Sequence, residues 1–101
     1  MIRQVSIDDL AHAVEDGQVI VDVREPAEYA QGHVPSAINI PLDSVVGRRT
    51  ELGPGEPVYL VVGGKDRAME AAGVLDGGGY EVRPVEGGTR AWILSGRAMQ
   101  S

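Results

Sequence analysis

The feature that most constrains the fold is the alternation of short apolar runs with helical patterns along the whole chain. Two of these runs, Val19–Val21 and Val58–Val62, contain no charged residue. Such a run is typical of a strand buried on both faces, as strands in parallel sheets are. Strands that alternate with helices predict a mainly parallel sheet with helices on both faces. We therefore expect a layered α/β fold.

Capping and turn residues place the helices between these strands. Ser6, followed by two aspartates, predicts a capped helix that ends near Gly17. Thr89 is expected to cap the last helix. Further helical segments are expected at 26–29, 42–49 and 67–75, and further strands at 37–40 and 80–85.

Length and charge narrow the class of protein. The 101 residues suffice for one domain, which we expect to span residues 1–101. The net charge of -6 argues against a nucleic-acid or anionic-membrane partner, because binding to phosphates requires clustered lysine and arginine. The sequence contains neither a signal-peptide pattern nor an apolar run of about 18 residues, so we expect a cytoplasmic protein.

The chain contains no cysteine and only two histidines. This composition excludes a disulfide framework, a thiolate metal site and any chemistry that needs a protein thiolate. No cofactor and no metal are expected.

Two separated motifs resemble the signatures of rhodanese sulfurtransferase domains. Residues 22–25 (DVRE) with 32–41 (GHVPSAINIP) resemble the first signature, and residues 85–92 (VEGGTRAW) resemble the closing one. The resemblance covers roughly residues 3–97. It implies a rhodanese-like three-layer α/β fold with a five-stranded, mostly parallel sheet and helices on both faces.

The resemblance also implies where the chemistry of the family takes place. In rhodaneses the strand that corresponds to residues 58–62 delivers a cysteine, and a loop curls around it as far as an arginine at a helix start. The cysteine position falls here on Val62, and the loop is Gly63, Gly64, Lys65, Asp66 and Arg67. Sulfane sulfur is accepted by a thiolate, which valine lacks, so we expect no sulfur transfer. The loop also departs from the family at Lys65, usually glycine, and at Ala68, usually serine or threonine.

Several interpretations of the site residues stay open. The loop at 63–67 either binds an anion at the helix start or forms a tight turn with solvated charges. Asp22 and Arg24 match family residues near the cleft floor, where an ion pair with strand-end hydrogen bonds is the favoured interpretation. His33 is interpreted as a turn residue rather than a general base.

The leading hypothesis is a catalytically inactive rhodanese-like domain that binds a protein partner or a small anion. One alternative is a component of a sulfur relay whose reactive cysteine comes from a partner. Another is a structural dimerisation module. The chain is expected to be a monomer or a weak homodimer, and whether Val62 is natural or engineered stays open.

Overall fold

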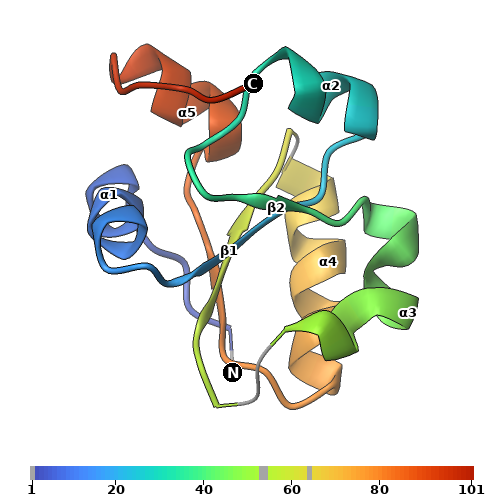
Figure 1. Ribbon diagram of the computed structural model, residues 1–101. Coiled ribbons are helices and arrows are strands. Elements are labelled where there is room, and N and C mark those ends of the chain that lie inside the picture. The colour runs from blue at the N-terminus through green and yellow to red at the C-terminus, as the bar shows by residue number, and fades with distance from the viewer. Residues whose placement is uncertain (1, 53–54, 64) are drawn as a thin grey trace.

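The chain folds around one parallel sheet with helices on both sides (Figure 1). The computed structural model describes residues 2–52, 55–63 and 65–101, without the side chains of 65–68. The elements in chain order are α1 (Ile7–Glu15), β1 (Val19–Asp22), α2 (Pro26–Gln31), β2 (Ile38–Asn39), η1 (Leu42–Ser44), α3 (Val45–Arg48), η2 (Arg49–Glu51), β3 (Val58–Val61), α4 (Lys65–Gly77), β4 (Val82–Pro84) and α5 (Gly88–Leu94).

The four strands are ordered β2-β1-β3-β4, and every neighbouring pair is parallel. The predicted parallel α/β architecture is therefore confirmed. Strand β1 lies between β2 and β3, with Val21 opposite Ile38 on one side and Leu60 on the other. The carboxyl ends of β1 and β3 consequently lie side by side, which brings the segments after Asp22 and Val61 to the same edge of the sheet.

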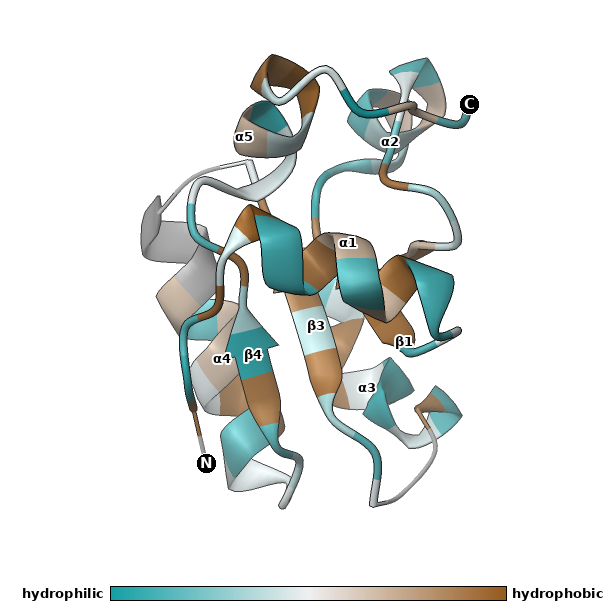
Figure 2. Ribbon diagram, turned by 90° about the vertical axis from the view of Figure 1, so that its left-hand side faces the viewer, coloured by the Kyte–Doolittle hydropathy of each residue, from teal (hydrophilic) through white to brown (hydrophobic). Residues whose placement is uncertain are grey.

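Strand β3 is buried on both faces, as its unbroken apolar run predicts. Val58 and Leu60 pack towards α3 and α4, while Tyr59 and Val61 pack towards α1 and α5. Figure 2 shows the apolar strand behind α1. Alternate side chains thus belong to two separate cores, one on each side of the sheet.

The first helix begins as predicted. The Ser6 hydroxyl accepts the Asp9 N–H at 3.1 Å, and the Asp9 carboxylate accepts the Ser6 N–H at 3.0 Å. This capping box satisfies two otherwise unpaired donors. The same hydrogen bonds to Ser6 hold the pKa of Asp9 below its ordinary value.

The expectation of five strands is wrong for the described residues, and Pro84 supplies the reason. The segment 2–5 runs parallel to β4, and the Arg3 and Val5 N–H groups donate to Val82 and Pro84 carbonyls, each at 2.9 Å. A continuous ladder would next require residue 84 to donate to the Arg3 carbonyl, and proline has no N–H. Only two isolated bridges, at Ile2 and Val5, remain of the fifth strand.

No helix in the described part of the chain combines the length and apolarity that crossing a bilayer requires.

We predict that Pro84→Val completes this fifth strand. The new N–H faces the Arg3 carbonyl, and one added hydrogen bond contributes about 1 kcal/mol. The Arg3 and Val5 amides should then exchange with deuterium up to about tenfold more slowly, as measured by NMR. Pro41→Val, which lies beyond β2 on the other side of the sheet, is the control and should leave both amides unchanged. Equal exchange in the two variants would show that Pro84 does not interrupt the ladder.

Candidate functional site

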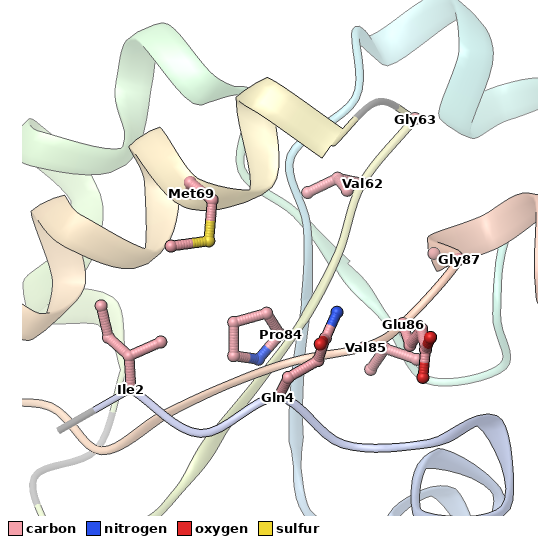
Figure 3. A pocket seen from close by; sticks show the side chains of 10 residues that line it. Ile2, Gln4, Val62, Gly63, Met69, Pro84, Val85, Glu86 and Gly87 are labelled. Atoms are coloured by element: carbon pink, nitrogen blue, oxygen red, sulfur yellow. The ribbon is translucent and has the colours of Figure 1, made fainter.

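A pocket of about 600 Å³ opens beside the carboxyl ends of β3 and β4 (Figure 3). Three segments line it: the N-terminal edge, the end of β3 with α4, and the turn after β4. The lining residues are Ile2, Gln4, Val62, Gly63, Met69, Pro84, Val85, Glu86, Gly87 and Gly88. Most of these residues are apolar or glycine, so the pocket is a largely apolar surface with a few polar groups.

Val62, at the position predicted for the nucleophile, forms part of the pocket wall. Its side chain also belongs to the core between the sheet and α4, and the residue is only 6% exposed. It follows directly after β3 in the apolar row of that strand. A valine here offers no proton, lone pair or charge to a ligand, so Val62 contributes shape and apolar surface alone.

The Val62 carbonyl ties the end of β3 to the start of α5. It accepts the Thr89 N–H at 3.2 Å. Gly88 passes so close that a Cβ on it would lie 2.2 Å from the same carbonyl oxygen, and its φ of +55° also favours glycine. The closing motif that marked the family therefore has a direct role in fixing the backbone at Val62.

The expected loop at 63–67 is shorter in the structure. Helix α4 begins at Lys65, two residues before the predicted start, so the backbone of 65–67 lies in its first turn. Lys65 replaces the glycine usual in the family, and lysine favours helix where glycine disfavours it. Gly64 and the side chains of Lys65, Asp66 and Arg67 lie outside the described residues, so anion binding by this segment stays a prediction.

Asp22 and Arg24 form a buried ion pair. The Arg24 guanidinium donates to both Asp22 carboxylate oxygens at 2.9–3.1 Å, and the side chains are 11% and 0% exposed respectively. The same guanidinium donates to the Gly32 carbonyl at 2.7 Å, and Asn39 donates to the Asp22 and Arg24 carbonyls at 3.0 Å. These bonds hold the segment after β1 against the turn at Gly32.

This ion pair reaches the end of β3 through the stem of Arg24. A Cβ placed on Gly63 would lie 3.6 Å from the Arg24 Cγ and 4.0 Å from a Glu28 carboxylate oxygen. The structure thus brings together Asp22, Arg24 and Gly63, and their role as support of a functional cleft stays a prediction. Because the Arg24 Nε and Nη2 groups are bonded to Asp22 and Gly32, the charge of Arg24 is balanced by a buried carboxylate and its side chain holds the backbone.

His33 lies between α2 and β2, in an isolated antiparallel bridge with Gln100, and is not part of the pocket lining. Its ring stacks on Tyr29 with centroids 3.7 Å apart, and Nδ1 lies 3.0 Å from the Tyr29 carbonyl oxygen, which can only accept. The His33 backbone exchanges two hydrogen bonds with Gln100, at 2.7 and 2.9 Å. Burial raises the pKa of the Tyr29 hydroxyl, and the Asp22 carboxylate raises it further. The interpretation of His33 as a turn residue is therefore corrected: it is a bridge residue that precedes the turn at 35–36, and its backbone and ring contacts are all structural.

Two features of the site were not foreseen from the sequence. Thr89 does not cap α5, because the helix begins one residue earlier, at Gly88 with Gly87 as its N-cap, so Thr89 lies within the first turn. Its hydroxyl is buried without a hydrogen-bond partner among the described residues. The second feature is the apolar wall that Ile2 and Met69 add to the pocket, which no motif marks.

The described residues contain no cluster of three or more His, Cys, Asp or Glu that could hold a metal.

Gly88→Ala should be strongly destabilising. The added methyl meets the Val62 carbonyl, and the left-handed backbone adds strain, so we expect a loss of about 3 kcal/mol or more in the free energy of unfolding. Gly73→Ala in α4 is the matched control, because nothing lies within 4 Å of the new Cβ and helix propensity should raise stability by up to about 1 kcal/mol. Urea denaturation measures both, and similar effects would contradict the close approach.

Thr89→Val should stabilise the fold. It replaces an unpaired buried hydroxyl with a methyl of nearly the same shape, which removes a desolvation penalty of about 1 kcal/mol or more. The exposed Thr50→Val is the control and should change the free energy of unfolding by less than about 0.5 kcal/mol. Thermal and urea denaturation report the difference. A clear loss of stability in Thr89→Val would show that the hydroxyl has a partner.

Known proteins resemble this chain in sequence and in structure. Residues 6–95 match the Rhodanese-like domain family. The chain is 38% identical over 74 residues to the uncharacterized protein YqhL of Bacillus subtilis, covering 72% of this chain and 59% of that protein. It is 29% identical over 99 residues to a sulfurtransferase of Allochromatium vinosum, covering 95% and 92% of the two chains. A rhodanese-related protein from Thermoplasma volcanium superposes with a TM-score of 0.88 at 26% identity, covering 97% of each chain. By fold, by both motifs and by these matches, the chain belongs to the rhodanese-like domain family.

Proposed function

We propose that this rhodanese-like domain does not transfer sulfur with its own side chains and acts as a binding module through the pocket beside Val62. One observation carries the proposal. The position at which the family places its nucleophile is a buried valine, in a chain without any cysteine. Persulfide formation requires a thiolate, and no other side chain of the chain replaces one.

The backbone around Val62 supports the same conclusion. A loop that stabilises an anion needs several N–H groups converging on one point. Among the described residues at this strand end, the Thr89 N–H is already used by the Val62 carbonyl. The described pocket walls offer apolar surface from Val62, Met69 and Pro84 instead. Such walls favour a partner with apolar side chains over a small free anion.

A sulfurtransferase assay tests the proposal directly. Purified protein with thiosulfate and cyanide should give no turnover above the buffer blank, and its intact mass should not increase by one sulfur atom. The Allochromatium vinosum sulfurtransferase, aligned over 95% of this chain, serves as the comparison protein. Reproducible turnover or a sulfur adduct would overturn the proposal.

A second candidate is a sulfur relay in which a partner supplies the thiol. The observation that favours it is the pocket at the family's reaction position, together with a relative named as a sulfurtransferase. In this case the chain should accelerate sulfur release from a persulfide carried by another protein. A carrier persulfide that decays at the same rate with and without the chain would exclude this role.

Val62→Cys should restore a thiol without restoring full activity. Its thiol would lie in the pocket wall, where apolar surroundings raise the pKa of a cysteine and slow its reactions. With α4 starting at Lys65, we expect sulfur transfer at least roughly 100-fold slower than in the comparison protein. Val61→Cys, fully buried on the other face, is the control and should react with a thiol reagent more slowly still. A variant as active as the comparison protein would show that the loop is already competent.

A further inference from the structure

The segment 2–5 forms the open edge of the sheet beyond β4. The Arg3 and Val5 N–H groups and the Val5 carbonyl bond towards β4, each at 2.9 Å. In an extended strand, alternate residues direct their backbone groups to opposite sides. The N–H and C=O of Gln4 therefore face outward, and within the described part of the chain neither makes a hydrogen bond.

This open edge adjoins the pocket. Ile2 and Gln4 line it from one side and Met69 lines it from α4, with Pro84 on the floor between them (Figure 3). Ile2 is 37% exposed and Met69 is 58% exposed, so both present apolar surface to solvent. Unpaired backbone groups beside apolar side chains are the two features that an added strand uses.

The charge on the pocket side of this edge favours a basic partner. Arg3 also belongs to the segment, but it alternates with the pocket-lining Ile2 and Gln4 and acts on Asp9 at the start of α1. Glu86 is the only charged residue among the described residues of the pocket lining, and its carboxylate makes no ion pair within the described chain. The whole chain carries a net charge of -6. A cationic segment gains from both the local and the overall field, whereas an acidic segment is repelled.

We propose that this edge, defined by Ile2 and Gln4 with the adjoining pocket, binds an extended segment of a partner protein whose pocket-facing side chains, at every second position, are apolar except for one basic residue. The segment adds to the sheet as a further strand, with backbone bonds to Gln4, apolar side chains in the pocket and a basic group at Glu86. The inference rests on the proposed function as a binding module and names its partner class. A second copy of the chain is disfavoured, because pairing two such edges would bring two unpaired Glu86 carboxylates to one interface.

The probe is a synthetic peptide that carries valine at every second position, one of these valines being replaced by lysine, with threonine at the positions between. Titrated into nitrogen-15-labelled protein, it should shift the amide signals of Gln4, Met69 and Glu86. The matched peptide with glutamate in place of that lysine should bind at least roughly tenfold more weakly, and salt should weaken the binding of the lysine peptide. Equal binding of the two peptides, or shifts confined to other faces, would overturn the inference.

A comparison of Gln4→Pro with Gln4→Ala distinguishes binding by strand addition from nonspecific binding of the peptide. The Gln4 N–H makes no internal bond, so both variants should fold, and denaturation confirms this. Only proline removes the outward donor, so Gln4→Pro should lose roughly tenfold more affinity than Gln4→Ala. Glu86→Gln should reduce the preference for the lysine peptide. If both Gln4 variants bind alike, the peptide does not extend the sheet.

Two further measurements keep the outcomes distinct. Sulfur turnover by the same sample would overturn the proposed function, whatever the result of the peptide titration. If the protein shows no turnover, and its peptide affinity depends neither on the charge of the peptide nor on Gln4→Pro, only this inference is overturned. Sedimentation over a concentration series tests the other occupant. A dimer that protects the Gln4 amide from exchange would assign the edge to a second copy and overturn the basic partner.

Discussion

The whole structure depends on β3 being apolar on both faces. Each face of this strand faces a different set of helices, so its four residues belong alternately to two cores. A charged side chain at any of these positions would have to lie within one of those cores without a partner, which is costly. The apolar row continues to Val62, which is also buried in the core, so the chain turns away from the sheet after Val62. The position of the site is therefore set by where this strand ends.

Much of the fold could be predicted because its signals are local. The apolar runs predict the central strands, and Ser6 with Asp9 predicts the first helix start, since each acts through neighbours in sequence. The number of strands could not be predicted in the same way. It depends on whether one N–H at position 84 meets a carbonyl at position 3, and this pairing is visible only once the N-terminal segment lies against β4.

The candidate site likewise has a part that could be predicted from the sequence and a part that could not. The motifs single out Asp22 and Arg24, which the structure places beside Gly63, and the absence of cysteine is read from the sequence alone. The start of α4 was misplaced because the family pattern was carried over a position, Lys65, at which this chain differs. The apolar pocket wall was missed because Ile2 and Met69 are distant in sequence and belong to no motif.

Catalytic and structural residues of a family signature can be separated by what each contacts here. Arg24 satisfies a buried carboxylate and the Gly32 carbonyl, and Gly88 is the residue that fits against the Val62 carbonyl. Both are needed for this backbone to fold, whether or not sulfur is transferred. Their presence therefore indicates the fold and does not indicate the reaction. The reaction would require a thiolate, which adds nothing to these contacts, and a chain can lose it while the surrounding scaffold stays intact. What remains is a strand end beside an open sheet edge. At this edge the Gln4 backbone groups and the Glu86 carboxylate have no partner among the described residues, so they are available to bind another molecule.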